Sequence, residues 1–206
     1  MSNGLRLAEI LAIRLCHDLS SPLGAMLGAS GVAEDEPALA GEAMAIMADA
    51  TQAMVRRIRL VRAAWGGPAP MSGSEFATMA ASLATKRVAI GTDDLDPLAV
   101  FGAEGARVAL NVLLLAVEAL HGNGTVTIGG DPSGDIVFGI AGKTSAWPAG
   151  FIGLLADPDS AWTMLDDPAK LQAPLTALLA QAAGFRISVL LGPNQEAAPP
   201  LLLRLS

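Results

Sequence analysis

The stretch RLCHDLSSPLG, residues 14–24, places a histidine, an acid and a proline at fixed offsets on one expected helix. At about 100° per residue, Leu11, Leu15 and Leu19 form a narrow apolar line, and His17 lies roughly 180° from Leu15. The neighbours of His17 on that opposite face are mostly small or aliphatic: Ile10, Ile13, Ser20, Ser21 and Gly24. A large partner can therefore approach the imidazole closely.

Pro22 lies just over one turn after the histidine. A proline inside a helix donates no backbone hydrogen bond, so the carbonyl of Asp18 loses its helical partner, at a cost of roughly 3 kcal/mol. The helix therefore either ends at Pro22 or bends there. Because apolar residues resume at Leu23 and Met26, we expect a bend.

Composition limits the classes of protein that this chain can form. The 206 residues suffice for one or two domains, and 52% of them are hydrophobic although only 4% are aromatic. Alanine, leucine and methionine supply this apolar content, which favours closely packed helices. The net charge of −7 argues against nucleic acid as the main partner, because phosphate binding needs a basic surface.

Cysteine usage and hydropathy indicate a cytoplasmic protein. The single cysteine, Cys16, allows no intramolecular disulfide, which fits a reducing compartment. Glu9 and Arg14 interrupt the apolar residues near the N-terminus, so no secretory signal is expected. Asn111 and Glu118 interrupt the best candidate for a membrane span. Two histidines and one cysteine also argue against a structural zinc site.

The first third of the chain predicts an antiparallel helical hairpin. Residues 5–32 form the first helix, and Asp35, Glu36 and Pro37 give a turn and a helix start. Residues 37–65 form the second helix, whose core-facing positions follow a three-four spacing: Ala40, Met44, Met47, Thr51, Met54, Ile58, Val61 and Trp65.

This hairpin carries more apolar surface than its two helices can cover for each other. Two hairpins from two chains would bury it in a four-helix bundle, so we expect a symmetric homodimer. The alternative is that another helix or a second domain covers the surface.

Residues 66–70 form a Gly/Pro linker, after which the hydrophobic period changes. We expect a helix at about 72–84, strands at 86–92 and 98–101, a buried helix at 104–120, a hairpin of strands at 125–129 and 135–141, helices near 149–156 and at 169–183, and strands at 185–191 and 200–205. The last helix should stop at Gly184. This order predicts an α+β sandwich, with residues 1–66 and 71–206 as two domains.

The histidine stretch resembles the phosphoacceptor box of bacterial histidine kinases: His17, the acid Asp18, the pair Ser21-Pro22, and Leu23. The longer run at residues 12–18, with aspartate in place of the usual glutamate, more closely resembles the ChpT-type histidine phosphotransferases. The element order after residue 71 resembles the ATP-binding domain of histidine kinases. The resemblance thus covers nearly the whole chain, and implies a dimeric four-helix bundle joined to a degenerate ATPase-like α/β sandwich.

Three features that such a domain needs for ATP are absent together. Aligned with the family's long helix, the chain keeps Asn111, but the magnesium-holding position falls on Leu115, which cannot ligate a cation that prefers oxygen. The strand that should end in aspartate and spaced glycines reads Gly-Ile-Ala-Gly-Lys at 139–143. Residues 167–174 replace the last glycine-rich loop. We therefore expect no nucleotide-binding residues.

The resemblance implies a phosphorelay intermediate. A neutral imidazole is a good nucleophile near neutral pH, so His17 can take a phosphoryl group from the receiver aspartate of a hybrid kinase and pass it to a response-regulator receiver, CtrA-type by resemblance. By resemblance, Asp18 hydrogen-bonds the ring; a solvated helix acid is the alternative. The receiver would supply magnesium, so this chain needs no cofactor or metal site of its own.

Four arginines, at positions 56, 57, 59 and 62, crowd the end of the second helix. They either compensate the helix dipole or dock an acidic receiver. At 1.5 Å rise per residue, Gln52 should lie roughly level with His17. The expected receiver-binding residues are Ile10, Ile13, Arg14, Gln52, Arg56 and Arg59.

Two other functions stay open: an ATP-dependent sensor histidine kinase, and a scaffold that docks receivers without passing phosphate. Without the neighbouring motif residues, His17 would be interpreted as a surface histidine that has no function. His121 reads as a helix-end residue, and Cys16 as a small packed side chain rather than a nucleophile.

Overall fold

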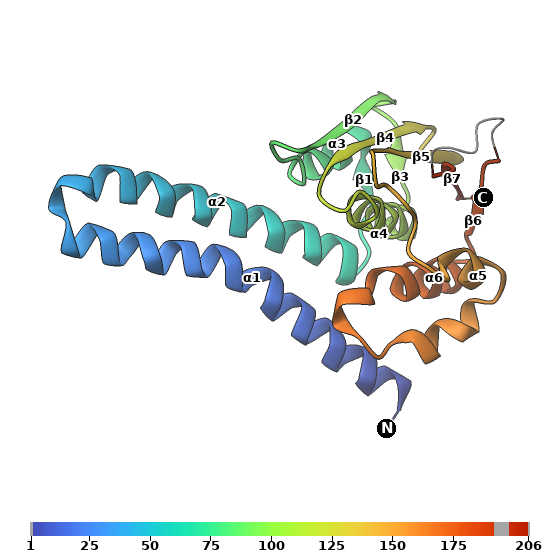
Figure 1. Ribbon diagram of the computed structural model, residues 1–206. Coiled ribbons are helices and arrows are strands. Elements are labelled where there is room, and N and C mark those ends of the chain that lie inside the picture. Colours follow the sequence, from blue (N-terminus) through green and yellow to red (C-terminus); the bar gives the residue numbers. More distant parts are fainter. Residues whose placement is uncertain (1, 192–197, 206) are drawn as a thin grey trace.

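The computed structural model describes residues 2–191 and 198–205, which form a long helical hairpin joined to an α/β body (Figure 1). The hairpin consists of α1 (Asn3–Asp35), the 3-10 turn η1 (Pro37–Leu39) and α2 (Ala40–Trp65). The Ser2 hydroxyl caps α1 by accepting a hydrogen bond from the Leu5 amide at 3.4 Å. The predicted hairpin is confirmed, with α1 longer at both ends.

Pro22 lies inside α1 and does not end it, so the alternative of a helix stop is wrong. Nearby, the Ser20 hydroxyl donates to the carbonyl of Cys16 at 2.8 Å, a side-chain contact that is often found in bent helices. The helix changes direction near its middle (Figure 1), as the missing backbone donor predicts.

The α/β body alternates short helices with strands. Its elements are β1 (Met71–Ser72), α3 (Gly73–Ala81), β2 (Val88–Leu95), β3 (Val100–Phe101), α4 (Ala103–Ala119), β4 (Gly124–Gly130), β5 (Asp135–Ala141), α5 (Phe151–Ala156), η2 (Pro158–Met164), η3 (Pro168–Lys170), α6 (Gln172–Ala183), β6 (Arg186–Val189) and β7 (Leu201–Arg204). The five-stranded sheet has the order β2-β4-β5-β7-β6, and only the β2–β4 pair is parallel. The predicted α+β sandwich with a mostly antiparallel sheet is therefore confirmed.

Local chemistry explains the element boundaries. Ser72 and Glu75 form a capping box that starts α3, with each side chain bonded to the other residue's backbone amide. Gly184 ends α6 in the left-handed conformation, at a φ of 73°. The predicted helix at 169–183 divides into η3 and α6, because the Asp167 side chain caps the short 3-10 turn by accepting from the Ala169 amide.

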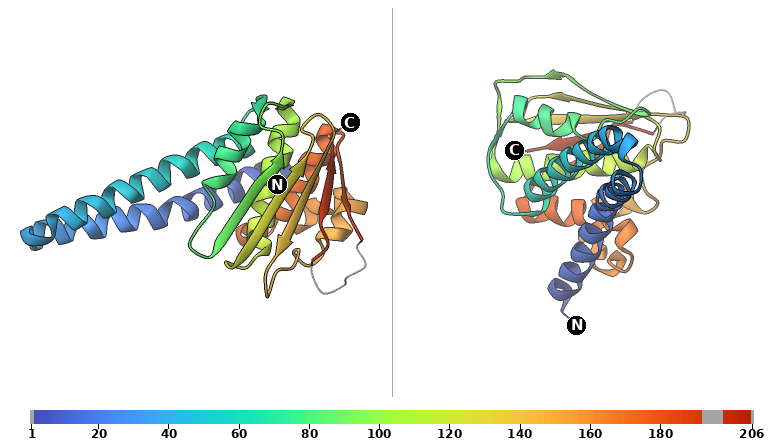
Figure 2. Two further views of the ribbon diagram at one scale, coloured as in Figure 1. Left: turned by 90° about the horizontal axis from the view of Figure 1, so that it is seen from above. Right: turned by 90° about the vertical axis from the view of Figure 1, so that its left-hand side faces the viewer.

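The helix α4 packs between the sheet and α6 and supplies much of the core (Figures 1 and 2). Most of its residues are buried, including Leu110, Leu113 and Leu115, which have no exposed surface. The open end of the hairpin joins this core through Leu60 and Ala64 of α2. The far end of the hairpin projects away from the body (Figure 2), and large apolar side chains there, such as Leu27 and Met44, are exposed. None of the helices formed by the described residues combines the length and apolar character that a bilayer span requires.

Candidate phosphoacceptor site

His17 projects from α1 toward solvent, with 82% of its side chain exposed. Ser20, Ser21 and Gly24 are also exposed on the following turns, and a Cβ at Gly24 would meet no atom within 4 Å. Ile13 is exposed as well. This part of α1 is therefore open to a macromolecular partner in the isolated chain.

Ile10, expected to contact a receiver, is instead fully buried, and that expectation is wrong. It belongs to a second apolar cluster with Leu154, Leu165 and Leu175. The helical wheel could not show that this end of α1 is covered, because the covering residues lie far away in the sequence.

Asp18 follows the histidine and is held by two arginines. Its Oδ1 accepts from Arg14 Nε at 3.1 Å, and its Oδ2 accepts from Arg57 Nη2. His17 Nδ1 lies 3.5 Å from the same Oδ1. Burial alone would raise the pKa of Asp18, but hydrogen bonding and charge from Arg57, together with the charge of Arg14, hold that pKa below its ordinary value. Asp18 is thus an anchored anion beside the imidazole.

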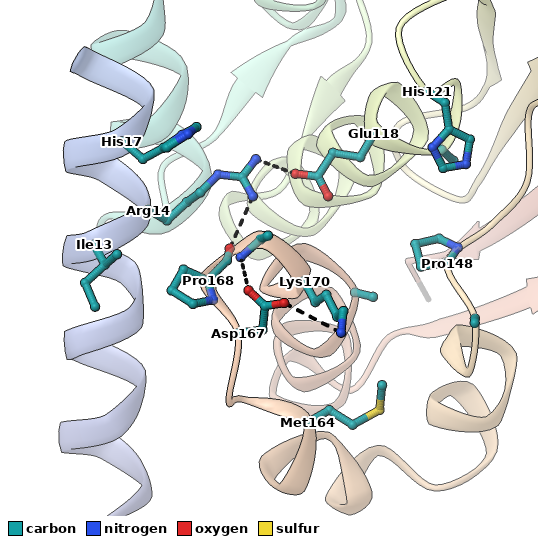
Figure 3. A pocket seen from close by; sticks show the side chains of 14 residues that line it. Ile13, Arg14, His17, Glu118, His121, Pro148, Met164, Asp167, Pro168 and Lys170 are labelled. Atoms are coloured by element: carbon teal, nitrogen blue, oxygen red, sulfur yellow. Dashed lines mark hydrogen bonds and ion pairs between the residues drawn. The ribbon is translucent and has the colours of Figure 1, made fainter. Parts of the chain in front are cut away.

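Arg14, expected on the docking surface, serves mainly as a link inside the molecule. Besides Asp18, it donates to Glu118 Oε1 from Nη2 at 2.5 Å and to the carbonyl of Pro168 from Nη1 at 3.3 Å (Figure 3). Burial raises the pKa of Glu118 above its ordinary value, although Arg14 opposes this rise. Four charged side chains, Arg57, Asp18, Arg14 and Glu118, therefore form a continuous ion chain from α2 through α1 to α4.

The hairpin register differs from the expected one. Thr51 Oγ1 lies 3.8 Å from Met26 Sδ, and Arg57 is level with Asp18. Gln52 consequently lies roughly 9–12 Å along the hairpin from His17 at the usual helical rise, not level with it. The added turn of η1 and the longer α1 shift the register. Arg56 and Arg59 are exposed near the histidine end of the hairpin.

A cleft of about 840 Å³ separates this part of α1 from the α/β body (Figure 3). One wall carries Ile13, Arg14 and His17, and the opposite walls include Glu118, His121, Pro148, Met164 and Lys170. His121 follows α4 with a φ of 51°, and its amide donates to the Glu118 carbonyl at 3.0 Å, consistent with a helix-end role. Both histidines of the chain thus border one cleft.

Asn111, on α4, belongs to a buried hydrogen-bond network. Asn111 Nδ2 donates to the Ala64 carbonyl at 2.7 Å, and its Oδ1 accepts from Gln172 Nε2 at 2.9 Å. Thr176 closes the network by contacting Gln172. These groups tie the end of α2 to α4 and α6. Among residues 2–191 and 198–205, no cluster of three or more His, Cys, Asp or Glu side chains could hold a metal ion.

Replacing Asn111 by leucine should lower the free energy of unfolding by roughly 2–4 kcal/mol, because it leaves buried partners such as the Ala64 carbonyl and Gln172 amide unsatisfied. Urea unfolding measures the change. Asn123→Leu, in an exposed turn, is the matched control and should change stability by less than about 0.5 kcal/mol. Equal losses in the two variants would contradict a structural role of the network.

The lowered pKa of Asp18 predicts a specific acid sensitivity. Its contribution to stability is fully present above pH 3.8, the ordinary value, and is lost as pH falls through the lowered pKa. The pKa of Glu118 is shifted in the opposite direction, above its ordinary value of 4.5. Its contribution to stability is therefore fully present below pH 4.5 and is lost as pH rises through the raised pKa. Asp18→Asn should therefore cost roughly 1–3 kcal/mol at pH 7 and flatten the loss of stability below about pH 4. Urea midpoints from pH 7 to 3 test this, with the exposed Asp49→Asn on α2 as control.

Sequence reasoning missed the role of Glu118, which it treated only as an interruption of an apolar run. The sequence did contain a signal for this role, because a single acid in the last turn of a buried helix needs a cation as its partner. Arg14 was a candidate for that partner, as the basic residue nearest His17 in the sequence. Sequence spacing could not pair two residues that are 104 positions apart.

The comparisons with known proteins identify the family of the chain. Residues 75–195, more than half of the chain, match the family model for the histidine phosphotransferase C-terminal domain. The protein phosphotransferase ChpT of Brucella abortus (strain 2308) is 29% identical over 200 residues, which span 91% of each chain.

The fold also resembles a solved bacterial phosphotransferase, at a TM-score of 0.71 and 21% identity over 99% of this chain and 97% of the other. The histidine kinase AdeS of Acinetobacter baumannii aligns more weakly, at a TM-score of 0.42 and 11% identity over 92% of this chain and 97% of the other. On the family match, the chain belongs to the histidine phosphotransferase family.

Proposed function

We propose that this protein is a phosphorelay intermediate in which His17 accepts a phosphoryl group from one receiver aspartate and delivers it to another. The observation that carries the proposal is the position of His17, which is 82% exposed on the edge of a cleft in a chain of this family. The donor would be the receiver domain of a hybrid kinase, and the acceptor that of a response regulator.

The transfer needs one nucleophilic nitrogen and little else from this chain. An unprotonated imidazole nitrogen attacks the phosphorus in line, the bond to the aspartyl oxygen breaks, and a phosphoramidate forms; attack by the acceptor carboxylate reverses the sequence. Because His17 Nδ1 faces Asp18 Oδ1, we assign Nε2 as the attacking atom. Mg²⁺, supplied in the acidic pocket of the receiver, would neutralise charge on the phosphoryl oxygens.

We further propose that ATP is not the phosphoryl source. Leu115 is fully buried, and Asn111 is engaged in the structural network. Residues 167–174, which align with the last glycine-rich loop of the histidine kinase ATP-binding domain, form η3 and the start of α6, and most of them border the cleft beside His17.

A homodimer through the hairpins accounts for the exposed apolar surface far from the α/β body. These side chains are Leu23, Leu27 and Val32 of α1 and Met44, Ile46, Val55 and Ile58 of α2. Large apolar side chains exposed in such number on one hairpin favour an interaction site, and a second hairpin has matching chemistry. In this proposal, residues 1–66 form the dimerisation and transfer domain, and residues 71–206 the degenerate ATPase-like domain.

The exposed Ile13, Arg56 and Arg59 would contact an acidic receiver. Charge attraction of this kind acts mainly on the association rate, and salt screens it over about 8–10 Å at moderate ionic strength. The docking surface should therefore be centred near His17 rather than at Gln52.

The test is incubation with a receiver that carries ³²P on its aspartate. We expect label to leave the receiver and appear on this chain as an acid-labile, base-stable phosphoramidate, and then to pass to a second receiver. In a parallel reaction, γ-labelled ATP should leave the chain unlabelled. Labelling by ATP would instead favour a histidine kinase, and receiver binding without transfer would favour a scaffold.

A further inference from the structure

Glu118 lies where α4 approaches α1, and it is the only acidic side chain in the ion chain that comes from the α/β body. Its carboxylate is largely removed from solvent, with 30% of the side chain exposed, and Arg14 is its ion-pair partner at 2.5 Å. A carboxylate in such a position needs a cation, because burial without one disfavours the charged form.

Arg14 lies close to the histidine along α1. It lies three residues before His17 on α1, so it occupies the neighbouring turn on nearly the same face. Its guanidinium also holds the Pro168 carbonyl at 3.3 Å, and both Glu118 and Pro168 border the cleft. One side chain therefore fixes α1 to two walls of the cleft into which His17 faces (Figure 3).

The other charged groups near this junction come from every element packed around it. Asp18 lies on α1, Arg57 comes from α2, and Asp167 and Lys170, which pair at 3.6 Å, come from the segment around η3. Arg57 already neutralises Asp18. Glu118 thus provides the negative charge that retains Arg14 on the α4 side.

We propose that Glu118 is a positioning residue for phosphotransfer, which latches α1 to the α/β body through Arg14 so that a receiver meets a preformed cleft beside His17. This inference rests on the proposed function. Glu118 acts through Arg14 and does not touch the phosphoryl group. Loss of the latch lowers the fraction of molecules with the docking-competent geometry, and apparent affinity falls in the same proportion.

The diagnostic variant is Glu118→Gln, which keeps the shape and removes the charge. We expect the receiver concentration that gives half-maximal transfer to rise about tenfold, within the usual range of coupling between sites, while the rate at saturation changes less than about twofold. Glu118→Asp should recover part of the loss. Glu104→Gln is the matched control, because Glu104 also lies on α4 and pairs with an arginine, Arg107 at 3.8 Å, but does not border the cleft.

Amide hydrogen exchange without any receiver provides a second readout. Exchange over the part of α1 that contacts the body should speed up about tenfold in Glu118→Gln and stay unchanged in Glu104→Gln. The positioning role would be overturned if Glu118→Gln exchanged its α1 amides at the wild-type rate. It would also be overturned if exchange became faster but the receiver concentration for half-maximal transfer stayed unchanged. If the wild-type chain accepts no phosphate, the proposed function is contradicted, and so is any role of Glu118 in phosphotransfer. The exchange data would still show whether Glu118 holds α1 against the α/β body.

Discussion

Replacing His17 by alanine should abolish phosphoryl acceptance from a phosphorylated receiver, with residual labelling below about one part in a thousand of wild type. The imidazole is the only nucleophile that this mechanism uses, and alanine has no group that can attack phosphorus. Because 82% of the side chain is exposed, the free energy of unfolding should change by less than about 0.5 kcal/mol. Time courses with labelled receiver and urea unfolding measure the two quantities.

His121→Ala provides a matched control, because His121 is the other histidine of the chain and borders the same cleft. It should retain transfer within a fewfold of wild type. If His121→Ala loses transfer while His17→Ala retains it, the phosphoacceptor is His121, at the end of α4, and not His17.

Introducing a charge at Leu27 should convert the proposed dimer into a monomer. Leu27 is 74% exposed on the distal part of the hairpin, and in a four-helix bundle Leu27→Asp would bury an unpaired carboxylate twice in each symmetric dimer. The dissociation constant should rise by at least about a thousandfold, since an unpaired buried charge costs several kcal/mol. Gel filtration with light scattering across a concentration series measures the shift.

The control for this change is Leu98→Asp. Leu98 is 86% exposed and lies between β2 and β3, outside the hairpin, so its replacement should leave the oligomeric state unchanged. A wild-type monomer at micromolar concentration, or a dimer that persists in Leu27→Asp, would contradict assembly through the hairpins.

The sequence was sufficient for the order of the α-helices and of the strands in the five-stranded sheet, because each carries a local signal, but the short β1 and η2 were not predicted. The three-four spacing of α2, the Asp131–Gly134 turn and the Gly184 stop all depend on residues close together in the chain. The turn is fixed locally, since Asp131 Oδ1 accepts from both the amide and the hydroxyl of Ser133. The observed helix boundaries differ from the predicted ones where a short 3-10 turn precedes the helix, as η1 does before α2 and η3 before α6.

The site was predictable only in part, for the same physical reason. Exposure of the His17 face follows from helical periodicity, but burial of Ile10 depends on Leu154 and Leu175, more than a hundred residues away. The ion chain likewise joins α1, α2 and α4, so it emerges only when the chain is folded. Asn111 shows a further limit: its side chain is fully buried in a structural network, whereas the alignment showed only that the chain keeps an asparagine there.

Mapping the phosphoryl group after transfer tests this mechanism most directly. The labelled chain would be digested at neutral to alkaline pH, which preserves phosphohistidine, and sequenced by electron-transfer fragmentation in a mass spectrometer. We predict one phosphoryl group per chain, on His17 within the RLCHDLSSPLG stretch. A phosphoryl group on His121 or any other residue, or a chain that stays unmodified while the receiver loses its phosphate, would contradict it.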